Sequence, residues 1–222
     1  MVNAAETHSA STREKLLDVA ERLFAQKSIE GVSIRSINSA AGLSPGILHY
    51  HFGNKESLIE AIIVRRINDV EQRREALYSN LNIKQTPISA LQIACLIVQP
   101  LADFATDNAE TGGDYIRLIS RLYADRSPQL LQIKKIHYET SDIDLPQLLT
   151  TACPDLPDTE VKLRLGFAEH LLLQDAIDWL PPALQQPSTA RQQVSFTERV
   201  HGLISFISAG LSAKASIESL SN

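Results

Sequence analysis

The sequence has few cysteines, few aromatic residues and no long apolar run. Cys95 and Cys153 lie far apart and lack the spacing and the nearby histidines of a zinc site. No apolar run approaches the roughly 20 residues that span a bilayer, and the first ten residues lack the apolar segment of a secretory signal. We therefore expect a cytoplasmic protein with no metal site and no cofactor.

Positive charge is also not in excess. The net charge is −5 over 222 residues, and the hydrophobic content of 44% is that of a globular protein with a real core. Residues 1–78 hold ten basic and ten acidic residues, whereas residues 79–222 hold eleven and sixteen. The acidity therefore belongs to the second part, and the neutral first part would not repel nucleic acid.

Residues 33–52, SIRSINSAAGLSPGILHYHF, read as two short helices joined by a tight turn. Ser33 is expected to cap the first helix, and Gly42 suits a left-handed residue after it. Ser44 and Pro45 resemble an N-cap followed by the first helical position, and the second helix should end near Phe52. A short helix that presents small and hydrogen-bonding groups suits a DNA major groove.

The rest of the chain also follows helical periodicity, which predicts an all-α fold. Residues 1–10 are expected to be a disordered tail, and Ser11 to Glu14 a capping box that opens a helix ending near Lys27. Asn54 is expected to cap a long helix with an apolar stripe from Leu58 to Leu77, and further helices are predicted at about 87–106, 113–125, 128–140, 143–152, 158–180 and 195–218. Pro100 should kink or split its helix, and residues 181–194 should form a loop. We assign a helix-turn-helix domain to 11–56 and a helical regulatory and dimerisation domain to 57–222.

The segment GLSPGILHYHFGNKE resembles the helix-turn-helix of the tetracycline-repressor (TetR) family, over about Thr12 to Ile63. Gly46 would let the helix backbone approach DNA closely, and Tyr50 and His49 could donate hydrogen bonds. Lys55 could hold a phosphate. The residues expected to contact DNA are Thr12, Ser33, Arg35, Ser44, Pro45, Gly46, Ile47, His49, Tyr50 and Lys55.

Two other interpretations apply to this segment. Tyr50 could be a buried core aromatic, since tyrosine is intermediate in burial. His49 and His51 could form a metal pair, but their spacing points them to different sides of a helix.

One helix-turn-helix contacts a single half-site, so dimerisation is expected. The last two long helices carry apolar stripes that could form a four-helix interface, which is also how the resembled family dimerises. The stripes comprise Leu165, Ala168, Leu172, Trp179, Phe196, Val200, Leu203, Ile207 and Leu211. Alternatively, they are only intramolecular core.

The family resemblance also implies a pocket for a small hydrophobic or amphipathic effector within residues 87–152. Its possible lining residues are Leu96, Pro100, Phe104, Tyr115, Ile119, Leu122, Tyr123 and His137, each of which could equally be core. The leading hypothesis is a ligand-responsive dimeric repressor that binds a palindromic DNA operator.

Two alternatives are a small α-helical enzyme and a helical scaffold without DNA binding. The enzyme hypothesis finds no G-x-S-x-G, HExxH or phosphate-loop motif. His170 with Glu169 or Asp175 is better read as a solvated helix face.

Overall fold

The structure is a computed structural model that describes residues 4–27, 29–81, 87–107, 112–124, 128, 131–133, 135, 143–179 and 194–215. Within these ranges every element is a helix, as the sequence predicts. The chain divides into two units, residues 1–68 with 109–137 and residues 69–108 with 138–222. The boundary between residues 68 and 69 lies inside one helix and differs from the predicted boundary after residue 56.

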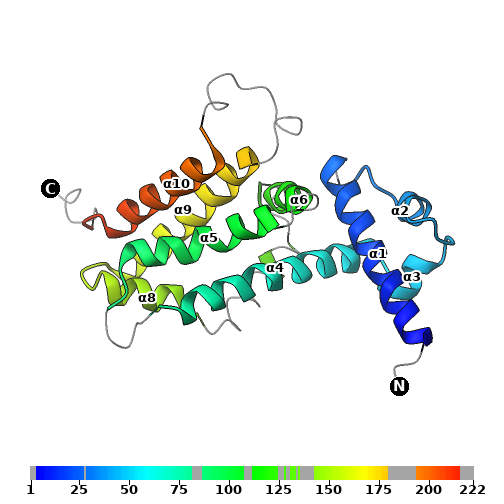
Figure 1. The fold of residues 1–222 in the computed structure, drawn as a ribbon, viewed down its shortest axis with the longest axis horizontal. Helices are drawn as coiled ribbons and strands as arrows, with labels where there is room; N and C mark the ends of the chain where they lie inside the picture. The colour runs from blue at the N-terminus through cyan, green and yellow to red at the C-terminus, as the bar shows by residue number, and fades with distance from the viewer. Residues whose placement is uncertain are drawn as a thin grey trace. The chain divides into compact units, whose positions relative to one another are not determined.

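The first unit contains α1 (Ala4–Gln26), α2 (Ile34–Ala40), α3 (Ile47–Phe52), the first part of α4 (Lys55–Ser79) and α6 (Gly112–Ala124) (Figure 1). Helix α1 packs against α2 and α6, and α2 packs against α3. Large apolar side chains of these helices form a core that excludes solvent. They include Leu16, Leu17, Phe24, Ile37, Leu48, Leu58 and Ile62.

Helix α1 begins at Ala4, so the prediction of a disordered tail over residues 1–10 is wrong for residues 4–10. Ser11 consequently lies inside the helix and does not cap it. Alanine and glutamate in this segment favour helix, while serine and threonine cost only a few tenths of a kcal/mol at exposed helical positions. Ser11 and Thr12, which precede the apolar stripe, therefore do not mark the start of the helix, because the helix can extend through them toward the N-terminus.

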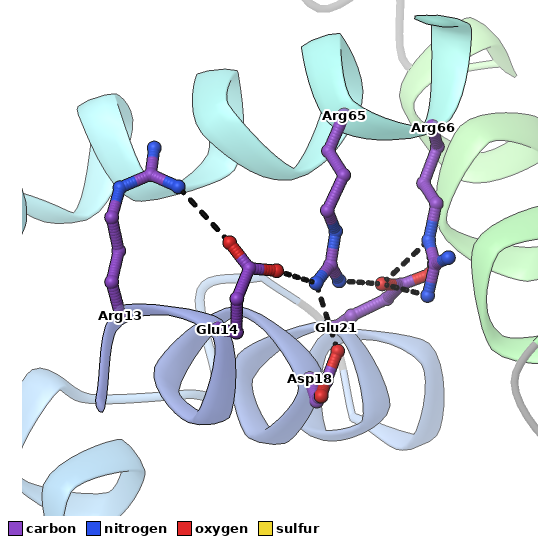
Figure 2. Close-up of polar contacts among 6 residues, drawn as sticks. All are labelled: Arg13, Glu14, Asp18, Glu21, Arg65 and Arg66. Carbon is purple, nitrogen blue, oxygen red and sulfur yellow. Dashed lines mark hydrogen bonds and ion pairs between the residues drawn. The ribbon is translucent and has the colours of Figure 1, made fainter. Parts of the chain in front are cut away.

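Arginines of α4 hold α1 through the ion pairs that Figure 2 shows. Arg65 donates to Glu14, Asp18 and Glu21 at 2.9, 2.9 and 2.7 Å. Arg66 donates to both carboxylate oxygens of Glu21 through Nε at 3.0 Å, and to Oε2 through Nη2 at 2.9 Å. Burial raises the pKa of Glu21 more than these arginines lower it.

Helix α6 contributes a hydrogen-bond donor to the end of α1. Arg121 Nη1 donates to the backbone carbonyls of Phe24 and Lys27, both at 3.3 Å. The last carbonyls of a helix lack intrahelical partners, and a guanidinium group also stabilises the negative end of the helix dipole. Arg121 thus ties α6 to α1 within the first unit.

The second unit contains the rest of α4 together with α5 (Ala90–Asp107), α8 (Leu145–Ala152), α9 (Asp158–Ala176), a 3₁₀ turn η1 (Ile177–Trp179) and α10 (Phe196–Ser212) (Figure 1). Helix α5 packs against α8, α9 and α10, and α9 packs against α8 and α10. Asp144 caps α8 and Ser195 caps α10 through their side chains.

Helix α10 ends at Ser212, short of the predicted 218, because Ala213 leaves the helical conformation. The predicted helix over 128–140 and the loop over 181–194 lie largely outside the described residues. Within the described residues, no helix has both the length and the apolar character that crossing a membrane demands.

Helix α5 runs unsplit through Pro100, contrary to one of the predicted outcomes. Proline has no N–H, so the carbonyl four residues earlier, that of Leu96, loses its usual helical donor. Arg74 of α4 supplies a replacement, because its Nε donates to the Leu96 carbonyl at 2.9 Å. A side chain from α4 therefore satisfies the acceptor that the proline leaves behind.

Candidate nucleic-acid interface

The first helix of the predicted pair begins and ends as expected. The hydroxyl of Ser33 accepts from the backbone N–H of Ser36 at 3.1 Å, and the Ser36 hydroxyl contacts the Ser33 N–H in return. Gly42 follows the helix with φ of 65°, a conformation that glycine adopts without steric cost. The Ser33 hydroxyl is thus already used as a cap.

The second helix, α3, begins later than predicted. Its N-cap is Gly46, not Ser44, and its first residue is Ile47 instead of Pro45. The backbone carbonyl of Ser44 instead accepts from the Ile47 N–H at 3.1 Å, which closes a turn before the helix. The Gly46 backbone has an ordinary φ of −87°, and a side chain built there would meet nothing within 4 Å.

Several predicted contact residues lie together on the outer surface of the helix-turn-helix. Tyr50 is 79% exposed, which rules out the interpretation that it is a core aromatic. Ser44, Pro45, Gly46 and His49 are exposed as well. At the inner side Leu48 is fully buried, so α3 packs through one face and presents the other.

The remaining predicted contact residues are distributed around this surface. Arg35 is exposed on α2, Ile47 is half-buried on α3, and Thr12 is half-buried on α1. Phe52 at the end of α3 is half-buried, and the guanidinium of Arg13 lies 5.1 Å from its ring centroid.

His49 and Lys55 have partners within the chain. The His49 ring contacts the Gly53 carbonyl through Nδ1, so Nδ1 must carry the proton and Nε2 is the nitrogen left to meet a ligand. The Lys55 ammonium donates to the carbonyls of Ile29 and Val32 at 2.9 and 3.1 Å. Since an ammonium has three N–H groups, one donor remains for a phosphate.

Sequence reasoning missed Asn38, whose side chain joins α2 to α3. Asn38 is 1% exposed, its Nδ2 donates to the Pro45 carbonyl at 3.0 Å, and its Oδ1 accepts from the Leu48 N–H at 3.2 Å. The available signal was a polar residue next to Ile37 on the face that packs inward.

The residues predicted to line an effector pocket belong to both units. Leu96, Pro100 and Phe104 are buried on α5 in the second unit. On α6, in the first unit, Tyr115, Ile119 and Leu122 are buried and Tyr123 is half-buried. His137 lies outside the described residues. The pocket stays a prediction.

Most residues predicted for the dimer interface are instead buried inside the second unit. They are Ala168, Leu172, Val200, Ile207 and Leu211. Leu165, Leu203 and Trp179 are half-buried, Phe196 is exposed, and the Trp179 and Phe196 rings meet edge to face. The predicted stripe therefore mainly joins α9 and α10 to the rest of their own unit.

A different apolar strip of α9 and α10 faces outward. It contains Leu163, Phe167 and Leu171 of α9 and Phe206 of α10, and Phe167 and Phe206 are 63% and 66% exposed. The strip borders a hollow of about 400 Å³ that Arg164 and Gly210 also line. Large apolar patches at the surface mark interaction sites.

Comparison with known proteins identifies the family of this chain. Residues 16–62 match the bacterial regulatory proteins of the tetR family, and residues 96–210 match the tetracyclin repressor-like C-terminal domain. The chain belongs to the TetR family. It is a transcriptional regulator with a DNA-binding helix-turn-helix, and not an enzyme, because the family and the curated relatives are regulators.

The curated relatives resemble this TetR-family chain over a short segment. The HTH-type transcriptional repressor KstR2 of Rhodococcus jostii is 36% identical over 75 residues, 33% of this chain and 37% of the relative. The HTH-type transcriptional regulator UidR of Escherichia coli is 34% identical over 65 residues, 29% of this chain and 33% of the relative. The chain thus spans about a third of the length of these relatives.

Solved structures are similar over most of the chain. A tetR-family regulator from Shewanella has a TM-score of 0.63 at 16% identity, covering 91% of this chain and 99% of the other. The ketosteroid transcriptional regulator KstR2 of Mycobacterium tuberculosis has a TM-score of 0.59 at 18% identity, covering 91% and 95%. At these identities the likeness supports the TetR fold alone.

Proposed function

We propose that this regulator is a dimeric, ligand-responsive repressor that binds a palindromic operator through the outer face of α3. The observation that carries the DNA assignment is Gly46. Its φ does not need a glycine, and among the described residues a side chain at this position would meet nothing within 4 Å. A bare, exposed backbone at the N-terminus of α3 fits the close approach of a DNA phosphate.

Exposure of neighbouring groups supports the same surface. Tyr50 can donate its hydroxyl to a phosphate or a base edge, and Arg35 of α2 can reach the backbone of the duplex. The free donor of Lys55 is available for a further phosphate. The first 78 residues have no net charge, so affinity must come from a few placed contacts and should fall as salt rises.

The DNA assignment is tested with Gly46→Ala and Gly46→Ser, using a duplex selected by the wild-type protein from a random library. Both variants should keep the thermal stability of the wild type, and serine should even favour the N-cap position. Both should bind the selected duplex at least about tenfold more weakly, the scale of one lost specific contact. Unchanged affinity for both variants would refute the assignment.

The proposed dimer interface is the outward strip of α9 and α10, in place of the inward stripe. Gly166 on α9 and Gly202 and Gly210 on α10 adjoin this strip, and a side chain at each would meet nothing within 4 Å. A glycine inside a helix costs roughly 0.5–1 kcal/mol relative to alanine. Close packing of a second copy against these positions gives them a function, and Phe167 and Phe206 would fill the interface.

Light scattering of two matched variants tests this interface. Phe206→Glu should convert a dimer to a monomer, because it places a charge in an apolar contact. Leu91→Glu is the control, since Leu91 is 52% exposed on α5 and outside the strip. A dimeric Phe206→Glu variant, or a wild-type monomer at micromolar concentration, contradicts the proposed interface.

Repression would be relieved by a small hydrophobic or amphipathic effector. The ligand can release DNA only by binding one conformation more tightly than the other. The support is the family membership and the apolar character of α5, whose buried residues include Leu96 and Phe104. A thermal-shift screen with fatty-acid-like and aromatic compounds tests this part, and a positive compound must also lower DNA affinity. We propose a cytoplasmic location, because an operator-binding regulator must reach the DNA.

A further inference from the structure

The N-terminus of α3 lacks a cap from its own N-cap residue. Helices usually satisfy the N–H of the second or third residue through an oxygen on the N-cap side chain, but Gly46 has none. The second residue of α3 is Leu48, and its N–H is bonded by Oδ1 of Asn38 at 3.2 Å. A residue of α2 therefore caps α3 in place of Gly46.

Asn38 makes three connections across the turn. Its backbone carbonyl accepts from the Leu43 N–H at 2.9 Å, and its side chain bonds the Pro45 carbonyl and the Leu48 N–H. One residue of α2 thus holds the start, the middle and the end of the connection to α3. Both polar atoms of the amide group therefore have a hydrogen-bond partner, although the side chain is only 1% exposed.

Helix α3 depends on such contacts for its placement. It has six residues, far fewer than the roughly 12–15 that an isolated helix needs to be even marginally stable. Its direction is set by what holds its ends and by Leu48 in the core. Loss of the bonds at its N-terminus would leave the helix able to tilt about Leu48 while the core remained closed.

We propose that Asn38 is a positioning residue for DNA recognition: it contacts no DNA and sets the orientation of α3 through the bonds to Pro45 and Leu48. The inference rests on the proposed function of the outer face of α3. Contacts to base edges read the sequence, whereas phosphate contacts carry no sequence information directly. A misplaced α3 should therefore lose sequence discrimination more than overall affinity for DNA.

The test compares Asn38→Leu with wild type, and measures anisotropy on the wild-type-selected duplex and on a scrambled duplex of equal length. Leucine has a similar size and makes neither bond. Affinity for the selected duplex should fall about tenfold or more, while affinity for the scrambled duplex changes less than about threefold. Binding is measured where circular dichroism shows the variant fully folded, so lost stability cannot explain the ratio.

Two further variants keep the outcome decisive. Ile37→Val is the control, because it weakens the adjacent core position without touching the turn and should keep the wild-type ratio. Asn38→Asp keeps the acceptor for the Leu48 N–H but replaces the donor to Pro45 with a buried carboxylate oxygen that faces the Pro45 carbonyl, so its ratio should fall as well.

An unchanged ratio for folded Asn38→Leu overturns the inference, and so does failure of both Asn38 variants to fold, since Asn38 would then maintain the fold itself. If the wild type selects no sequence at all, the proposed DNA-binding surface fails instead.

Discussion

Replacing Glu21 by leucine should destabilise the first unit strongly, because it removes the shared partner of two arginines. Glu21 is 2% exposed and accepts hydrogen bonds from both Arg65 and Arg66 (Figure 2). Arg66 is itself buried and donates three bonds to this carboxylate. Removing one partner of a buried ion pair typically costs 3–5 kcal/mol, since the other charge stays in the interior.

The expected change is large against the total stability of such a protein. A domain is stable by about 5–15 kcal/mol, so the variant would lose a considerable share. At about 2–4 °C per kcal/mol for a chain of this size, the melting temperature should fall by roughly 10 °C. Arg66→Met should produce a similar loss, whereas combining it with Glu21→Leu should be less harmful than either single change, since a matched apolar pair replaces the ion pair.

Urea unfolding of the two single variants and the double variant measures these losses in the free energy of unfolding. Arg65→Met is the comparison, because Arg65 divides its ion pairs between buried Glu21 and the exposed residues Glu14 and Asp18. Exposed pairs contribute about 0–1 kcal/mol each, so this variant should lose less stability than Arg66→Met. A double variant as unstable as the sum of the single variants would refute the reasoning. So would a Glu21→Leu variant with the midpoint of the wild type.

Three smaller predictions concern other polar side chains. Lys55→Met should lower thermal stability as well as DNA affinity, because it removes two bonds to the α1–α2 connection, whereas a residue that only contacts DNA would lower affinity alone. Arg74→Met should cost about 1–3 kcal/mol in urea by removing the donor to the Leu96 carbonyl and the ion pair to buried Glu71, more than Arg73→Met, whose ion pair is exposed. Burial raises the pKa of Asp114, against the opposing effect of nearby arginines, so the folded protein binds this proton more tightly than the unfolded chain. The stability due to Asp114 should then fall as pH rises from about 4 through the raised pKa, and Asp114→Asn should remove that slope in melting curves at pH 5 and 7.

Local rules predicted most of the helix-turn-helix. Ser33 caps α2 and Gly42 adopts a positive φ after it, as the sequence indicated, and Gly53 adopts a positive φ at the end of α3. Asn54 also accepts from the Ser57 N–H at 2.7 Å before α4. Each of these features depends on residues within a few positions, so one sequence contains the information.

The start of α3 depends on a distant residue and was therefore predicted wrongly. Ser44 and Pro45 satisfy the local rules for a helix start, yet the helix begins at Ile47. Asn38 supplies the cap from ten positions before Leu48 and holds the Pro45 carbonyl in the turn. A cap from another helix has no local signature, so the polar residue beside Ile37 could indicate a buried side chain but not its role as the cap of α3.

The predicted dimer interface shows a second limit of prediction from sequence, which concerns two adjacent apolar stripes on one helix. On α9, Ala168 and Leu172 are buried, while Phe167 and Leu171 are exposed one residue earlier. Neighbouring residues differ by about 100° around a helix, so both stripes have the same periodicity and similar hydropathy. Periodicity alone cannot decide which of them faces the chain's own core. The structure decides through the glycines, because Gly166 costs helix stability and no contact with the described residues requires it. A stripe that borders such a glycine is the better prediction for a surface that a second copy covers.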